Sequence, residues 1–72
     1  MRNQLLNSRD YNETLEMMYI DQNRIVSKRK ILVLQVGDVS FRAYCHLRKS
    51  KRTFKIDNVL ALVPVMTREK VI

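Results

Sequence analysis

The stretch that decides the fold runs from Val39 to Asp57 and reads VSFRAYCHLRKSKRTFKID. Apolar and polar residues alternate in its first half, which is typical of a β-strand with one face in the core and the other in solvent. We expect the core face to carry Val39, Phe41, Ala43, Cys45 and Leu47. The opposite face then carries a basic and aromatic stripe, made of Ser40, Arg42, Tyr44, His46 and Arg48.

The second half of this stretch predicts a partner strand, about residues 52–57, that pairs with the strand at about 39–47. We expect a loop of even length centred on Lys49 and Ser50. The expected cross-strand pairs are Cys45 with Phe54, Ala43 with Ile56, Tyr44 with Lys55, His46 with Thr53 and Arg42 with Asp57. This register favours apolar contacts on one face and an opposite-charge pair on the other.

Outside residues 39–57, the sequence predicts one helix and three more strands. Apolar residues at helical spacing near the start indicate a helix at about residues 2–9. Strands are expected at about residues 15–20, 25–36 and 59–65. Asp21 to Arg24 supplies a hairpin turn in which Asn23 tolerates a positive φ, and Gly37-Asp38 supplies the next turn.

These elements predict a mainly β domain over residues 1–72, a small SH3-like or Sm-like five-stranded barrel with a short N-terminal helix. Pro64 makes the last strand an edge strand, because proline cannot donate to a ladder. Thr67 to Ile72 is expected to be a frayed tail. A chain this short buries only about 60% of its unfolded surface, so its stability should be modest.

The composition narrows the class of partner. The chain has 72 residues and a net charge of +7, which favours polyanions, with nucleic acid first and an anionic membrane surface second. As a function, membrane binding is a distant third, because no expected helix combines a long apolar face with a basic one. It has one Cys and no secretory signal pattern, so we expect a cytoplasmic protein. No apolar run approaches the roughly 20 residues that a membrane span needs.

Two segments of the two predicted strands and the residues after them resemble a known family. Residues 43–48 (AYCHLR) and 52–59 (RTFKIDNV) resemble the C-terminal half of the WYL domain, where AYCxLR, a short loop and RTFxxDxI are typical. The preceding hairpin fits the opening strands of that family, so the resemblance covers roughly residues 10 to 65. The namesake Trp-Tyr-Leu would fall on residues 39–41, which are Val-Ser-Phe here, and Asn58 stands where an Arg is usual.

The resemblance implies an Sm-like β-fold that serves as a sensor or regulatory module in bacterial and phage-associated regulators. Such domains usually follow a winged-helix DNA-binding domain and are proposed to bind nucleic acid or a nucleotide-like ligand, sometimes controlling oligomerisation. Carried over onto matching positions, the resemblance makes Tyr44, His46, Arg48 and Arg52 candidate ligand contacts.

Physical chemistry gives an independent argument for nucleic acid. Single strands are held by a positive groove together with aromatic rings on which bases stack. Tyr44 is the stacking platform, His46 a weaker second, and single-stranded nucleic acid is favoured over a duplex. The candidate site residues are Arg42, Tyr44, His46, Arg48, Lys51, Arg52 and Lys55. Arg52 begins its strand on the core-facing side, so it must reach the ligand from the mouth of the barrel.

Each of these features also has a purely structural explanation. The basic stripe can be a solvated face, Tyr44 can simply cover the sheet, and His46 can be an exposed strand residue. The run at residues 28–30 (KRK) begins the long strand in solvent, or extends the basic surface. Cys45 is expected to fill the core, because adjacent strand residues face opposite ways and cannot form a dyad with each other.

The sequence gives little support to enzymatic chemistry. The acids are scattered, one His and one Cys fall short of a metal site, and a single Gly excludes a glycine-rich phosphate loop. We therefore expect no enzyme and no cofactor. The first functional hypothesis is a regulatory module that binds nucleic acid or a nucleotide-like anion and modulates transcription. The alternative is an assembly module whose last strand pairs with a second copy or with a partner regulator.

Overall fold

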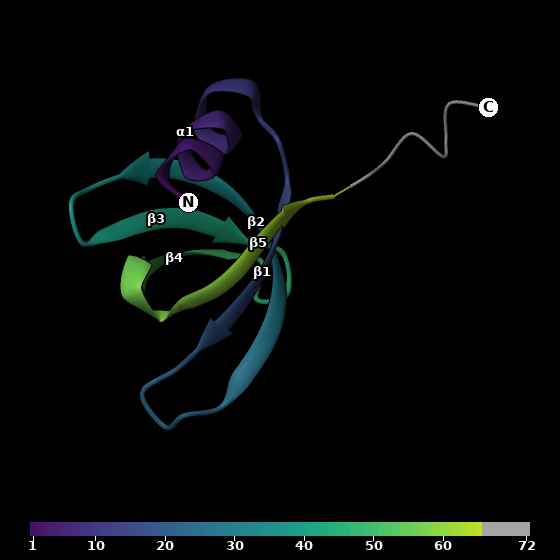
Figure 1. Ribbon diagram of the computed structural model, residues 1–72. Helices are drawn as coiled ribbons and strands as arrows, with labels where there is room; N and C mark the ends of the chain where they lie inside the picture. Colours follow the sequence, from purple (N-terminus) through teal and green to yellow (C-terminus); the bar gives the residue numbers. More distant parts are fainter. Residues whose placement is uncertain (66–72) are drawn as a thin grey trace.

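The computed structural model describes residues 1–65 of this chain, and the tail expected at Thr67 to Ile72 lies outside them. The elements are α1 (Arg2–Tyr11), β1 (Leu15–Ile20), β2 (Val26–Val36), β3 (Ser40–Cys45), β4 (Ser50–Lys55), the 3₁₀ helix η1 (Ile56–Asn58) and β5 (Val59–Pro64). The strands form one antiparallel sheet in the order β4-β3-β2-β1-β5 (Figure 1). The predicted fold class, a mainly β domain with an SH3-like or Sm-like arrangement and an N-terminal helix, is confirmed.

The curvature of the sheet depends on β2, which is its longest strand. Residues 26–31 of β2 pair with β1, while Ile31 and the residues after it pair with β3. The β2–β3 register shifts between Val33 and Gln35, and such a bulge increases the local bend and twist of a strand. One strand therefore serves both halves of the sheet, and the sheet curls around a single interior.

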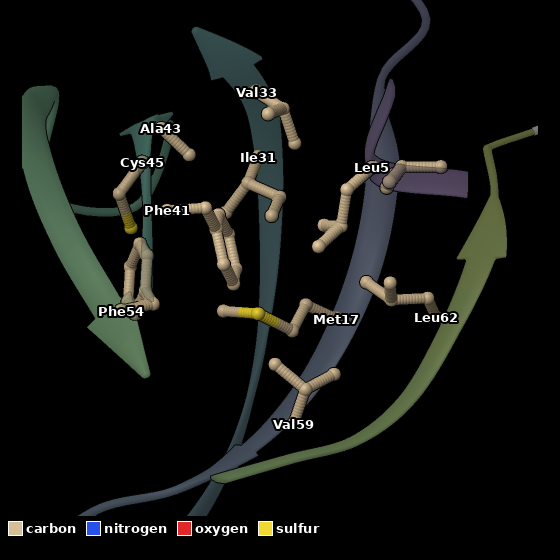
Figure 2. Close-up of a cluster of buried hydrophobic side chains, with 11 residues drawn as sticks. Leu5, Met17, Ile31, Val33, Phe41, Ala43, Cys45, Phe54, Val59 and Leu62 are labelled. Atoms are coloured by element: carbon tan, nitrogen blue, oxygen red, sulfur yellow. The ribbon is translucent and has the colours of Figure 1, made fainter. Parts of the chain in front are cut away.

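The core fills this interior. Figure 2 shows side chains from α1 and all five strands converging on it. The buried apolar residues are Leu5, Leu15, Met17, Ile31, Val33, Phe41, Ala43, Cys45, Phe54, Val59 and Leu62. Phe41, Ala43 and Cys45 are buried as predicted. The prediction was wrong for Val39 and Leu47, which are 75% and 66% exposed, because β3 covers only Ser40–Cys45 and both residues lie in turns.

The predicted register between β3 and β4 gave the wrong cross-strand partners, but it placed the paired residues on the correct faces of the sheet. The loop has an even length, as expected, but it occupies residues 46–49, with Cys45 paired to Ser50. Phe54 therefore lies opposite Phe41 instead of Cys45. The other observed pairs are Ser40 with Lys55, Arg42 with Thr53, Ala43 with Arg52 and Tyr44 with Lys51. Because the displacement is even, every side chain keeps the face that the alternation predicted.

β3 is shorter than predicted because the chain turns directly after Cys45, at residues 46–49. Lys49 closes the turn with a φ of 54°, in the left-handed region. His46 and Arg48, expected at the end of a strand, consequently belong to the turn. The β4 strand begins earlier than predicted, at Ser50, and ends earlier, at Lys55.

The turn between β1 and β2 follows the prediction in place but not in detail. One Asp21 carboxylate oxygen accepts the backbone N–H groups of Asn23 and Ile25 at 2.8 and 2.9 Å. The residue with positive φ is Arg24, at 64°, and not Asn23. The carboxylate fixes the amides on either side of Arg24, and this places the left-handed residue between them.

Helix α1 covers the end of the sheet opposite the β1–β2 turn (Figure 1). The Arg2 guanidinium donates to the Gly37 carbonyl at 2.8 and 3.0 Å, and the Gln4 side chain donates to the Leu62 carbonyl at 3.0 Å. Leu5 and Ser8 are fully buried against the sheet. The helix thus joins the β2–β3 turn to β5 at this end of the molecule.

Ser8 is the buried polar residue of the core, and the sequence pattern did not identify it. Its hydroxyl oxygen accepts the Val33 N–H at 3.0 Å. Val33 lies next to the β2 bulge and beyond the last β1 partner, where no neighbouring strand takes that N–H. The helix therefore satisfies a backbone donor that the bent strand leaves open.

We predict that Ser8→Ala lowers the free energy of unfolding by about 1–3 kcal/mol, because it leaves the Val33 N–H buried without an acceptor. Urea denaturation followed by circular dichroism measures the change. Ser50→Ala, at an exposed position, is the matched control and should change stability by less than about 0.5 kcal/mol. Equal stability of the two variants would contradict this account of the helix.

Candidate functional site

An open depression of about 410 Å³, here called the first depression, lies between the β1–β2 turn and β4. The side of the turn contributes Tyr19, Asp21, Gln22 and Asn23. The other side contributes Arg29, Arg48, Arg52, Thr53, Phe54, Lys55 and Asn58. Segments from β1, β2 and β4, from two turns and from η1 meet here, although they are far apart in the sequence.

Three arginines from three different segments converge on the first depression. Arg29 lies on β2 two residues before the buried Ile31, and Arg52 lies on β4 two residues before the buried Phe54, so alternation turns both toward the concave face. Arg48 comes from the β3–β4 turn. Ion pairs within residues 1–65 join Arg2 to Asp38 and Arg9 to Asp10, so none of the three has a carboxylate within 4.0 Å in this part of the chain.

Arg29 is the most firmly positioned of the three. It is half-buried, its Nε donates to the Ser27 hydroxyl at 3.2 Å, and its Nη1 donates to the Cys45 sulfur at 3.7 Å. Burial by itself raises the pKa of the Cys45 thiol. Hydrogen bonds from the backbone of Arg48, from Arg29 and from the backbone of Leu47, with the Arg29 charge, outweigh burial and hold this pKa below its usual value.

An aromatic wall separates the first depression from the core. The Tyr19 ring meets the Phe54 ring edge-on, with centroids 5.1 Å apart, and Phe54 in turn lies 5.6 Å from Phe41. The Tyr19 hydroxyl accepts the backbone N–H of Lys55 at 2.9 Å. This hydrogen bond joins β1 to β4 across the open side of the sheet, and it fixes the width of the depression.

The side formed by the β1–β2 turn is polar and carries one carboxylate. Asp21 lines the first depression, but one of its oxygens is already bonded to two backbone N–H groups of the turn. Asn23 and Asn58 add amide groups that can both donate and accept. The first depression is therefore cationic toward β2, β4 and the β3–β4 turn, and polar with one negative charge toward the β1–β2 turn.

The residues predicted to form one site are divided between two faces. Arg48, Arg52 and Lys55 line the first depression. Arg42, Tyr44 and Lys51 line neither depression, and strand parity places them on the outer face. The rings of Tyr44 and His46 meet edge-on with centroids 5.3 Å apart.

A second depression of about 310 Å³, here called the outer depression, lies on the outer face next to the β3–β4 turn. It is lined by Glu16, Lys28, Arg29, Lys30, His46 and Leu47. Cross-strand register places Glu16 beside Lys30, and the backbone N–H of His46 donates to the Lys30 carbonyl at 3.0 Å. Arg29 lines both depressions.

The sequence argument missed Arg29 and Tyr19 as parts of the site. Arg29 was assigned to the run at residues 28–30, in which only the middle residue faces inward. The signal that could have found it is parity, because Arg29 is two positions from the apolar Ile31. Tyr19 had the same signal, since it alternates with the buried Met17 on β1.

Comparisons with known proteins support the fold. The described arrangement of one helix and five strands is similar to part of proteasome accessory factor B/C (PafBC) of Arthrobacter aurescens, with a TM-score of 0.83 and 24% sequence identity. The similarity covers 92% of this chain and 11% of that chain. No family model and no curated protein sequence matches the chain.

Residues 1–65 contain no group of three or more His, Cys, Asp or Glu side chains that could hold a metal ion. In the same part of the chain, α1 is the one α-helix, and it lacks the length and apolar character that are needed to cross a bilayer.

We predict that Tyr19→Phe lowers the free energy of unfolding by about 0.5–1.5 kcal/mol, because it removes the acceptor of the Lys55 N–H but keeps the ring against Phe54. Hydrogen exchange followed by NMR should show a faster Lys55 amide. Tyr44→Phe is the matched control, since the Tyr44 hydroxyl makes no hydrogen bond within residues 1–65. If the Lys55 amide exchanges equally fast in both variants, the Tyr19 hydroxyl does not hold β4 in place.

Proposed function

We propose that this chain is a non-catalytic regulatory module that binds nucleic acid or a nucleotide-like anion in the first depression and thereby modulates transcription. The observation that carries the proposal is the convergence of Arg29, Arg48 and Arg52 on one concave surface with no carboxylate partner in residues 1–65. Grouped like charges repel one another, and a bound anion relieves that repulsion.

Guanidinium groups suit phosphate in particular. Each presents N–H donors in a planar fork that can bind two oxygens of one phosphate. Arg29 is held in place by Ser27 and Cys45, so little side-chain entropy is lost when it binds. Arg48 and Arg52 are exposed and can adjust around the ligand.

The remaining lining residues fit the rest of a nucleotide. The Asp21 carboxylate repels phosphate, so the phosphate should lie toward β4 and the sugar and base toward the β1–β2 turn. There, Asp21 and Asn23 offer oxygens to hydroxyl and amino groups, and Asn58 offers another amide. Tyr19 supplies an aromatic surface beside them.

The regulatory part of the proposal rests on similarity. The AYCHLR and RTFKIDNV segments resemble the WYL domain, and the fold is similar to a segment of an accessory factor, PafBC. A shared fold alone does not establish a shared function. The arginine cluster is therefore the stronger support, and the test is directed at it.

We predict that Arg48→Gln and Arg52→Gln each weaken binding of nucleoside phosphates and single-stranded oligonucleotides by about tenfold or more, because each removes a charge-assisted contact worth about 1.5–3 kcal/mol. Isothermal titration calorimetry against a panel of nucleoside mono-, di- and triphosphates measures the change. The affinity should also fall with salt, by about 0.7 in log K per log unit for each phosphate of a single strand that is neutralised.

Arg9→Gln is the matched control, because it removes one positive charge from α1, outside both depressions. It should leave affinity within about twofold. Unchanged affinity in both Arg48→Gln and Arg52→Gln, with the variants still folded, would remove the proposal.

A second candidate function is assembly through β5. This strand ends the sheet order, and residues 59–64 carry no charge, while Leu60 and Val63 are 51% and 50% exposed. The opposite edge strand, β4, carries Lys51, Arg52 and Lys55, and charged side chains of this kind discourage strand pairing. An uncharged, partly apolar edge is the one better suited to pair with a second copy or with a partner regulator.

If β5 mediates self-association, Val63→Lys should convert dimers to monomers, because pairing would bury the new charge. Size-exclusion chromatography with light scattering over a concentration series measures the state. Val39→Lys makes the same substitution at a valine that is 75% exposed in the β2–β3 turn and should leave the dimer intact. A wild-type chain that stays monomeric throughout the series contradicts self-association.

A further inference from the structure

A group of apolar side chains lies on the outer face of β1, β2 and β5, away from the core and from the first depression. Strand parity turns Met18 and Ile20 outward on β1, because they alternate with the buried Met17. Met18 lies beside Ala61 of β5, and Ile20 lies beside Val26 of β2. We call this surface the outer patch, and its members are Met18, Ile20, Val26, Leu60, Ala61 and Val63.

The outer patch is open to solvent. Val26 is 48% exposed, Leu60 and Val63 are exposed to a similar extent, and Met18 and Ile20 are half-buried. The β1–β5 register passes from Val59 directly to Ala61, so Leu60 is an extra residue at a bulge and adds to the same surface. Adjoining exposed apolar side chains on a small domain mark an interaction surface.

The outer patch has a charged border on one side only. Lys28 lies beside Met18 on β2, and Lys30 lies beside Glu16. Neither lysine has a carboxylate within 4.0 Å in residues 1–65. On the opposite border, residues 59–64 of β5 carry no charge. A partner that fits this surface is therefore apolar at its centre and acidic along one side.

We infer that the outer patch binds an amphipathic α-helix of a partner protein, with the apolar face of the helix on the patch and its acidic side chains against Lys28 and Lys30. This inference goes beyond the proposed function, because it uses the face of the sheet opposite the first depression. The outer depression, which both lysines line, adjoins the charged border and can receive one of the acidic side chains.

A helix suits this surface better than a strand does. The backbone groups of β1 are already paired with β2 and β5, so the face of the sheet offers no ladder to an added strand. A helix satisfies its own backbone hydrogen bonds and binds through side chains at i, i+3, i+4 and i+7. Three adjacent strands span about 10 Å, which matches the diameter of one helix. From Glu16 to Ile20 the patch is about 13 Å long, or about two and a half helical turns.

Other occupants fit the charges less well. A second copy offers one carboxylate on this face, Glu16, against two lysines, and it brings its own net charge of +7. An anionic membrane would bury Glu16, which lies between Val63 and Lys30 on the same face, against a surface of like charge. A helix can place a polar or basic side chain opposite Glu16 and acids opposite the lysines.

The test uses the 72-residue chain and three labelled helical peptides of about 16 residues, a length at which a helix can form in water. All three carry the same row of leucines at i, i+3, i+4 and i+7, and they differ along one side, which is lined with Glu, Gln or Lys. Fluorescence anisotropy at about 150 mM salt measures binding, because this salt screens exposed charges that are not in contact. The Glu peptide should bind at least tenfold more tightly than the Lys peptide, with the Gln peptide between them.

The double variant Lys28→Glu, Lys30→Glu should reverse this order, so that the Lys peptide binds more tightly than the Glu peptide. Arg42→Glu, Lys51→Glu is the matched control, since it changes the net charge equally on the outer side of β3 and β4. The control should keep the wild-type order. Circular dichroism verifies that both variants are folded.

The apolar part of the inference has its own pair of variants. Val26→Asn should weaken all three peptides by about fivefold, because it removes apolar contact area from the outer patch. Val39→Asn makes the same substitution in the β2–β3 turn and should leave the affinities unchanged. NMR chemical shifts of the wild-type chain should change on β1, β2 and β5 when the Glu peptide is added.

Several results would overturn the inference. Equal binding of the three peptides, or a lysine double variant that keeps the wild-type order, removes the role of Lys28 and Lys30. Displacement of the Glu peptide by thymidine monophosphate places the peptide in the first depression instead. If Val26→Asn dissolves a dimer of the free chain in light scattering, the occupant is a second copy. If the chain binds phosphatidylglycerol vesicles through Val26 and none of the peptides, the occupant is a membrane.

Discussion

The hydrogen bond from the Lys55 N–H to the Tyr19 hydroxyl is the contact on which the candidate site depends. β1 and β4 are not neighbours in the sheet, so no ladder fixes the distance between them. A curled sheet left open on this side would let β4 move away from the β1–β2 turn. The phenol bridges that opening, and the ring that carries it packs edge-on against Phe54, which anchors the bridge in the core. The width of the first depression is therefore set from the hydrophobic interior.

The same logic applies to the other end of the molecule, where α1 closes the sheet. The bulge near Val33 bends β2 far enough to bring β3 and β4 around the core, but it leaves a backbone N–H without a strand partner. Ser8 accepts it. At both ends of this small sheet a side-chain hydroxyl, from Tyr19 or from Ser8, accepts a backbone N–H that no neighbouring strand takes.

The alternation of residues 39–57 predicted that Phe41, Ala43 and Cys45 face the core, because a period of two depends only on parity, but it was wrong for Val39 and Leu47 in the flanking turns. It did not predict where β3 ends, because His46 and Leu47 continue the polar and apolar alternation of the strand although they lie in the turn at residues 46–49. Because the β3–β4 loop has an even number of residues, the paired residues stay on their predicted faces, although each pairs with a different partner. The candidate site was harder to predict than the core. Arg29 and Arg52 occupy inward positions, where alternation predicts core residues. Only the curvature of the sheet places those positions at a rim that is open to solvent.

The grouping of Arg29, Arg48 and Arg52 also has a thermodynamic meaning. Like charges near one another destabilise the folded state, and a chain of 72 residues has little stability in reserve. Any anion that binds the folded form alone removes part of this repulsion and adds RT ln(1 + [L]/Kd) to the free energy of unfolding. Because the arginines come from β2, the β3–β4 turn and β4, a bound anion would contact three segments that are separate in the sequence.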